Sequence, residues 1–192
     1  MARRRAIMAR MARTRPNPPV VHLIVALLLV LLPALVAVWW FQRVPEPPIA
    51  RTDPAPVASM AAEAAPYAVA VPVLPDGWVC TRARWTPQGR PGLGGDPAAG
   101  NTFALGYLSP DQRYFAVDQR DAQPAAFVVA VTRSGVRAGD SAVAGRTWVR
   151  YQSADGRTRS LVLQNADHVT IVSGDVPYES LESFAGALRF GS

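Results

Sequence analysis

The sequence predicts an α+β fold: a mostly antiparallel sheet covered by helices on one face and preceded by one transmembrane helix. Three observations lead to this prediction. Residues 20–41 contain neither Arg nor an acidic residue. Several short segments further along alternate polar and apolar side chains between turns rich in Gly and Pro, which is typical of strands. Other segments carry apolar residues at helical spacing. Runs of strands flanked by helices indicate α+β rather than repeated βα units.

Composition divides the 192 residues into four predicted parts. These are a basic cytoplasmic tail (1–19), a transmembrane helix (20–41), a Pro- and Ala-rich linker with a short helix (42–65) and an extracytoplasmic α+β domain (66–192). A domain of that length can bury a sufficient core without disulfides.

Charge is concentrated at one end of the chain. All 20 basic residues are Arg, and residues 1–65 carry eight of them against three acidic residues. Residues 66–192 carry 12 Arg against 11 acidic residues, so the predicted domain is nearly neutral. A nucleic-acid-binding domain would keep a basic patch on its folded part, so we expect no nucleic-acid partner. One Cys and two His exclude a Cys/His zinc cage, and we expect neither a metal nor a cofactor.

The apolar segment Val20–Phe41 predicts a single membrane span. At about 1.5 Å per residue its helix is about 33 Å long, which is enough to cross a hydrocarbon core of about 30 Å. The Arg-rich start of the chain places the N-terminus in the cytoplasm and residues 42–192 outside. A cleaved signal peptide is the alternative, but its apolar region is normally only about 7–15 residues long. The residues expected at the membrane interface are Arg3, Arg4, Arg5, Arg10, Arg13, Arg15, Trp39, Trp40 and Phe41.

Beyond the span, local patterns predict each element in turn. The Pro-rich segment 42–56 is expected to be extended, and the Ala-rich segment 57–65 is expected to be a helix that either packs on the domain or lengthens the linker. Segment 87–100 holds five Gly and three Pro and is predicted to be a loop. Helices are predicted at 124–132, where the Val content also allows a strand, and at 178–188. Strands are predicted at 78–85, 102–108, 113–119, 146–152, 157–164 and 168–173, with hairpin turns at Ser109–Asp111 and Asp155–Gly156.

Few residues are candidates for a catalytic role. Asp118 and Asp121 could form a carboxylate pair for hydrolysis, although neighbouring Arg residues make ordinary ion pairing the simpler interpretation. A catalytic Ser/His/Asp set could draw only on His168 outside the predicted span, but His168 follows Asp167 at a strand start, where a satisfied surface His is the simpler interpretation. Strand alternation places Cys80 on one face with Arg82 and Arg84, where a neighbouring Arg could lower its pKa, but a small buried side chain is the simpler interpretation.

Two further features have a simple structural interpretation. The Gly-rich loop is followed by a predicted strand rather than by a helix N-terminus, so it does not match a phosphate-binding loop. Arg157 and Arg159 flank the Asp-Gly turn and could bind an anion, but Arg residues beside turns are usually solvated.

Several segments, taken in order and spacing, resemble the actinobacterial "domain of unknown function 4245" family. They are Leu74–Trp78, Arg84–Pro87, the Gly-rich loop, Leu105–Leu108, Asp121–Pro124, Phe127 and Ser153–Leu161. The resemblance spans roughly Ala37 to Leu188. It implies a single-pass membrane protein with an extracytoplasmic domain, and it implies no activity, cofactor or catalytic residue.

Together these observations predict a non-enzymatic binding or accessory module of the cell envelope, with the lipid bilayer and an envelope protein or small ligand as partners. The alternative is a small envelope hydrolase that uses Asp118 and Asp121.

Overall fold

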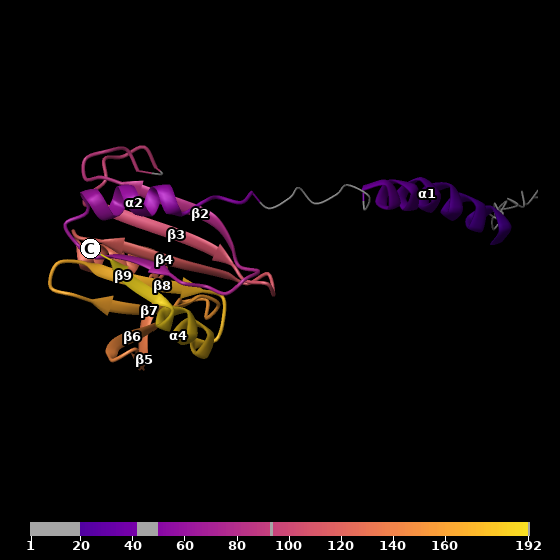
Figure 1. The fold of residues 1–192 in the computed structure, drawn as a ribbon. Coiled ribbons are helices and arrows are strands. Elements are labelled where there is room, and N and C mark those ends of the chain that lie inside the picture. Colours follow the sequence, from indigo (N-terminus) through magenta and orange to yellow (C-terminus); the bar gives the residue numbers. More distant parts are fainter. Residues whose placement is uncertain (1–19, 42–49, 93, 192) are drawn as a thin grey trace, which may run out of the picture. The chain divides into compact units, whose positions relative to one another are not determined.

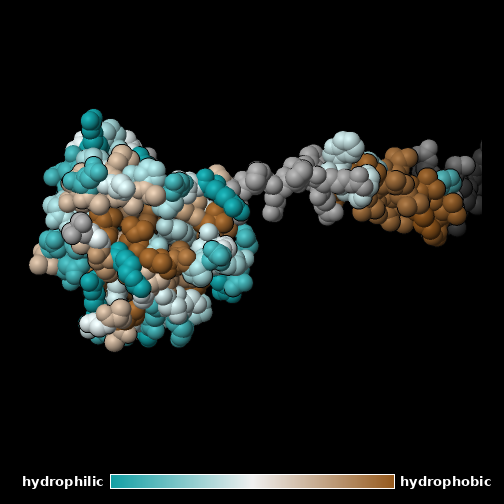
Figure 2. Space-filling model, viewed as in Figure 1, coloured by the Kyte–Doolittle hydropathy of each residue, from teal (hydrophilic) through white to brown (hydrophobic). Residues whose placement is uncertain are grey.

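A computed structural model describes residues 20–41, 50–92 and 94–191, and the chain forms two compact units, Met1–Pro48 and Ile49–Ser192. In the first unit the structure describes α1 (Val20–Phe41), whose described side chains are exposed along its length. Hydrophobic residues cover this helix (Figure 2). Among the described helices, α1 is the one long and apolar enough to cross a membrane. A helix that is apolar all round is typical of such a span.

A seven-stranded antiparallel sheet forms the centre of the second unit (Figure 1). Two meanders build it, because β2, β3 and β4 follow one another along the chain and β5 to β8 do the same. The meanders join where β4 pairs with β8, which leaves β2 and β5 at the edges. In spatial order the strands are β2 (Val79–Thr86), β3 (Thr102–Leu108), β4 (Tyr114–Arg120), β8 (Val169–Gly174), β7 (Arg159–Gln164), β6 (Arg146–Gln152) and β5 (Val136–Val143).

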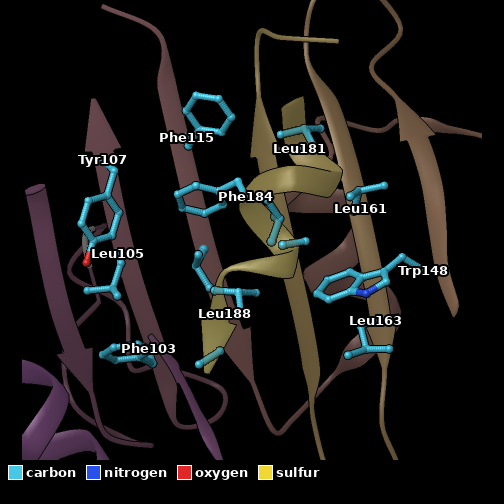
Figure 3. Packing of buried hydrophobic residues seen from close by; sticks show 14 of the residues in the cluster. Phe103, Leu105, Tyr107, Phe115, Trp148, Leu161, Leu163, Leu181, Phe184 and Leu188 are labelled. Carbon is cyan, nitrogen blue, oxygen red and sulfur yellow. The ribbon is translucent and has the colours of Figure 1, made fainter. Parts of the chain in front are cut away.

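The main core lies between one face of this sheet and a layer made of α2 (Ala55–Ala64), α4 (Tyr178–Gly186) and the strand pair β1 (Val69–Pro72) and β9 (Leu188–Gly191). Phe184 of α4 stacks on Phe115 of β4, with ring centroids 5.1 Å apart. Figure 3 shows these rings between large side chains of β3 on one side and of β6 and β7 on the other. Burying an aromatic side chain stabilises a fold by roughly 1.5–3 kcal/mol, so this layer holds the unit together.

The short helix α2 is part of this layer. Ala61 on α2 is completely buried, and Thr52, just before the helix, donates its backbone N–H to the Cys80 carbonyl at the edge of β2 (2.9 Å). The sequence left open whether this helix packs or extends the linker, and the structure shows that it packs. The predicted domain boundary at residue 66 stays a prediction.

A buried glutamine joins the small sheet to the large one. Gln119 of β4 has no exposed surface; its Oε1 accepts the Ala70 N–H (2.7 Å), and its Nε2 donates to the Ala68 carbonyl (3.1 Å) and the Thr170 hydroxyl (3.0 Å). Because a buried amide must be paired, these bonds fix the position of β1 over β4 and β8.

The opposite face of the sheet carries α3 (Pro124–Val131), which buries Phe127 against Val162, Val169 and Ile171. The predicted fold class is confirmed, but the sequence had placed the helices on one face only. The reason for the second layer lies in β7, where Leu161 enters the main core while Val162 faces α3. Strands that are apolar on both faces need cover on both.

Most predicted elements are confirmed, including the helix at 124–131, the loop before β3 and the turn at Asp155–Gly156. Three strands, β1, β5 and β9, were not predicted. Helix α4 ends at Gly186 instead of 188, because Leu188 pairs with Pro72. The turn between β5 and β6 lacks the usual Asn-Gly or Asp-Gly signal, since Ala144 stands at its first position with a positive φ of 49°.

Candidate functional site: a groove beside α3

The open part of the α3 face, over β2, β3 and β4, forms a groove of about 430 Å³. Small side chains of β3 make its floor, and the arginines of β2, the Gly-rich loop and α3 make its walls. Its lining residues are Arg82, Arg84, Thr86, Gly92, Asp96, Pro97, Ala98, Ala99, Thr102, Ala104, Asp118, Arg120, Phe127 and Val131. A hollow of this size, with polar groups among apolar walls, is typical of small-molecule sites.

The strand register explains the low floor. Ala104 of β3 pairs with Arg84 on one side and with Asp118 on the other, and Gly106 pairs with Arg82. Adjacent strands lie about 4.8 Å apart, so a side chain from β2 can reach β4 only over small residues. A Cβ on Gly106 would lie 2.2 Å from the Tyr114 hydroxyl, because the Tyr114 side chain crosses this glycine. The floor therefore requires small residues at these positions.

An ion pair spans this floor. The Arg82 Nη2 donates to the Asp118 Oδ1 at 2.9 Å, and the Asp118 side chain is only 15% exposed. Burial raises the pKa of Asp118 from its ordinary 3.8 to about 6, although Arg82 and Arg120 lower it. The Nε of Arg82 is buried and has no hydrogen-bond partner among the described residues. Arg82, Asp118 and Val131 also line a neighbouring hollow of about 320 Å³.

Two other arginines of the groove are not in ion pairs with any residue that the structure describes. Arg120 donates from Nε to the Thr102 hydroxyl (3.0 Å), and its guanidinium lies 4.4 Å from the ring centroid of Phe127. Its pKa is lowered because burial disfavours its charge. Arg84 is half-buried on β2. A half-buried guanidinium without a carboxylate partner can bind an anion at little cost in rearrangement.

Asp118 and Asp121 do not form a carboxylate pair in the described structure. Asp118 faces the groove and binds Arg82, whereas Asp121 accepts the backbone N–H of Asn101 (2.8 Å) and its side-chain amide (2.6 Å). Asp121 thus has a structural role at the end of β4. The ion pairing of Asp118 with an arginine agrees with the simpler interpretation of the sequence, although its partner is Arg82.

Cys80 lies on the other face from Arg82 and Arg84, which corrects the expectation from strand alternation. A bulge between Cys80 and Arg82 adds one residue to β2 and reverses the facing of the later residues of the strand. Cys80 packs in the main core, where burial raises its pKa. The described structure therefore gives this thiol no activating arginine.

The remaining candidates have structural partners. His168 is buried rather than on the surface: its ring stacks on Tyr67 at 4.8 Å, its Nδ1 lies 2.8 Å from Asp167 Oδ1, and its Nε2 lies 3.0 Å from the Asn165 side chain. Arg159 donates to the Val176 carbonyl (3.3 Å), and Arg157 is exposed at the turn. Within the described residues there is no cluster of three His, Cys, Asp or Glu that could hold a metal ion.

Of the predicted interface residues, Trp39 and Trp40 lie in the last turn of α1 and are more than half exposed. Phe41 is the last residue of the same helix. The six predicted interface arginines, Arg3, Arg4, Arg5, Arg10, Arg13 and Arg15, lie outside the described residues, so their position at the membrane stays a prediction.

Sequence reasoning did not find the groove. A sequence signal for it was present: Arg82 and Arg84 lie two residues apart on one strand, and the small residues Ala104 and Gly106 have the same spacing on the next strand. The bulge and the strand order, which bring these residues together with Arg120 and Phe127, carry no local sequence signal.

The fold and the site define a class of protein in which an apolar N-terminal helix is followed by an α+β unit with an arginine-lined groove. The chain belongs to the family described as "Protein of unknown function (DUF4245)", whose model matches residues 15–188. Among curated proteins no significant match is found.

Two solved structures are similar over part of the chain. "The complex structure of Pseudomonas aeruginosa MucA/MucB" contains a chain with 21% identity and a TM-score of 0.36, with 64% of this chain and 35% of that chain covered. "Crystal structure of MucB in complex with MucA(peri)" gives 20% identity and a TM-score of 0.36, with 64% and 36% covered. The chain thus spans about a third of the length of those chains. Similarity at this level describes neither a site nor a partner for this protein.

Proposed function

We propose that α1 anchors this protein in the cell membrane and that the unit beyond it is a non-enzymatic binding module of the cell envelope, which binds its ligand in the groove beside α3. One observation carries the binding role. Arg84 and Arg120 present charges without ion-pair partners among the described residues, next to apolar walls from α3 and the Gly-rich loop. Partly buried charges without a carboxylate partner are uncommon in side chains that only stabilise a fold, which supports a binding role for these two arginines.

The proposed topology rests on the flanks of α1. Six arginines and no acidic residue precede it, whereas Arg43 and Arg51 follow it together with Glu46 and Asp53. The positive-inside rule then places residues 1–19 in the cytoplasm and residues 42–192 outside. Anionic lipid headgroups attract each nearby arginine by about 1 kcal/mol, which supports an interfacial position for the basic tail.

Cysteine labelling tests this topology. The native Cys80 is buried, so a Cys80→Ala chain with Ala154→Cys carries one thiol at an exposed turn. We expect a membrane-impermeant maleimide to label this chain in intact cells. The matched chain with Ala6→Cys should be labelled only after permeabilisation, and the reverse pattern would overturn the topology.

Filling the groove tests the binding role. Ala104→Trp places a large ring on the floor, whereas Ala64→Trp adds the same ring to an exposed position of α2. In native mass spectrometry of the full chain purified from its own cells, we expect a small-molecule adduct with the wild type and with Ala64→Trp. The adduct should be lost in Ala104→Trp. Spectra without any adduct, or with equal adducts in all three proteins, would contradict a ligand-binding groove.

A small envelope hydrolase is the second candidate, favoured by the raised pKa of Asp118, which suits a general acid near neutral pH. Its bond to Arg82 and the separate role of Asp121 argue for the binding module instead. Asp118→Asn separates the two proposals, because a hydrolase loses turnover while a binding module keeps its ligand.

A further inference from the structure

We infer that the ligand of the groove is a small monoanion, in which one carboxylate is attached to a compact apolar body. This inference rests on the proposed binding function and adds the chemical class of the ligand. The carboxylate lies between Arg84 and Arg120, and the apolar body packs against α3 and the Gly-rich loop.

The charges of the lining favour one negative charge on the ligand. Arg82, Arg84 and Arg120 face two carboxylates, Asp118 and Asp96, so the lining has a net charge of +1. Asp118 is held by Arg82, and Asp96 is exposed on the loop. The charge that remains is shared by Arg84 and Arg120, and a single anionic group on the ligand balances it.

The register places these two arginines on either side of β3. Arg84 pairs with Ala104, and Arg120 pairs with Thr102, so they approach β3 from opposite sides at positions two residues apart. Strands β2 and β4 are two spacings apart, about 10 Å, which leaves room for one planar group above β3 between Thr102 and Ala104. Guanidinium groups bind carboxylates through parallel N–H donors, and Arg120 is already held in place by Thr102 and Phe127.

The other walls require an apolar and compact ligand. Phe127 and Val131 of α3 face Pro97, Ala98 and Ala99 of the loop, and none of these side chains offers a hydrogen bond. At about 430 Å³ the groove lies near the lower end of the usual range for small-molecule sites, which suits a single ring or a short branched chain better than a long acyl chain.

Binding of three matched probes to the full chain in zwitterionic nanodiscs tests the inference. The probes are 3-phenylpropionate, its neutral amide and 3-phenylpropylamine, which share one apolar body and differ in charge. Isothermal titration at pH 7.5 should give a dissociation constant at least about tenfold lower for the carboxylate than for the amide, and no binding of the amine. Because arginines supply the difference, we expect raised salt to reduce it.

Variants identify the site of this binding. Arg84→Gln and Arg120→Gln should each weaken carboxylate binding about tenfold or more and weaken amide binding much less. Arg113→Gln removes the same charge from an exposed turn outside the groove and should change neither. Thermal unfolding of each variant identifies any loss that comes from misfolding; Arg84 makes no ion pair in the described structure, so its variant keeps the test valid.

Other outcomes overturn the inference in distinguishable ways. Equal binding of the amide and the carboxylate, without any effect of the arginine variants, would reject the anionic ligand but leave the binding module standing. Tighter binding of inorganic phosphate, or loss of carboxylate binding in phosphatidylglycerol nanodiscs, would assign the arginines to phosphate or to a lipid headgroup. If no probe binds while the purified protein carries an adduct that Ala104→Trp loses, the ligand class is wrong and the groove is right. Absence of both signals rejects the groove itself.

Discussion

At the scale of single residues, Arg82 and Asp118 form an ion pair whose carboxylate is mostly buried. Their ion pair crosses β3 in a partly buried groove, where desolvation opposes the charge of the carboxylate. A buried pair of this kind often contributes little to stability, because desolvation offsets the attraction. Its proposed role is one of position, because an Asp118 that binds Arg82 leaves Arg84 and Arg120 to the proposed ligand.

The raised pKa of Asp118 predicts an unusual pH dependence of stability. The folded state binds this proton more tightly than the unfolded chain does, so its contribution is fully present below about pH 4 and is lost as the pH rises through about 6. Over that window the contribution falls by an amount on the order of 2–3 kcal/mol, at about 1.4 kcal/mol per pKa unit.

Urea unfolding at pH 4, 5, 6 and 7 measures this effect in Asp118→Asn relative to wild type. We expect the free energy of unfolding of the variant to improve relative to wild type as the pH rises from 4 to 6. Asp155→Asn is the flat control, because hydrogen bonds from Ser153 and Arg157 lower the pKa of Asp155, so its contribution changes only below about pH 4 and stays constant over this range. A difference between Asp118→Asn and wild type that does not change with pH would contradict the raised pKa.

At the scale of elements, local sequence patterns predicted some strands, whereas pairing with a neighbouring strand formed others. Strands β3 and β6 lie at their predicted bounds, because each shows clear alternation and is followed by a recognisable turn. Strand β5 was missed because its charged and small side chains are largely exposed at the edge of the sheet and show no such alternation. Its pairing with β6 comes from a tight turn at Ala144 and Gly145, both with positive φ.

This turn predicts a stabilising substitution. Ala144 has a φ of 49°, which Asn tolerates better than Ala, so Ala144→Asn should raise the free energy of unfolding by about 0.5–1 kcal/mol. Ala154→Asn makes the same change at an exposed turn residue without a positive φ and should have an effect below about 0.5 kcal/mol. Equal effects at the two sites, measured by urea unfolding, would show that backbone conformation is not the cause.

At the scale of the whole molecule, the chain combines an apolar helix with a unit that has its own core. The sheet and its two covering layers account for the described residues from 50 onward, and α1 has no part in that core. The proposed membrane attachment therefore depends on α1, while folding of the second unit depends on its own buried side chains.

Charged residues within α1 test this division. Each Arg near the centre of a membrane helix costs about 2.5–3.5 kcal/mol, so Leu28→Arg together with Leu31→Arg should oppose insertion by about 5–7 kcal/mol. After carbonate extraction we expect this variant in the supernatant and the wild type in the membrane pellet. The matched change of both residues to Ile should stay in the pellet, and a double-Arg chain that also stays there would contradict anchoring by α1.

The sequence by itself determined the membrane-type helix, most of the antiparallel strands and the family, because these depend on local composition, local periodicity and the order of short segments. Only the tertiary structure decided where the groove lies. A bulge places Cys80 in the core and Arg82 and Arg84 on the opposite face, and the pairing of three strands sets these arginines beside Arg120. These are contacts between residues far apart in the chain, and no local pattern specifies them.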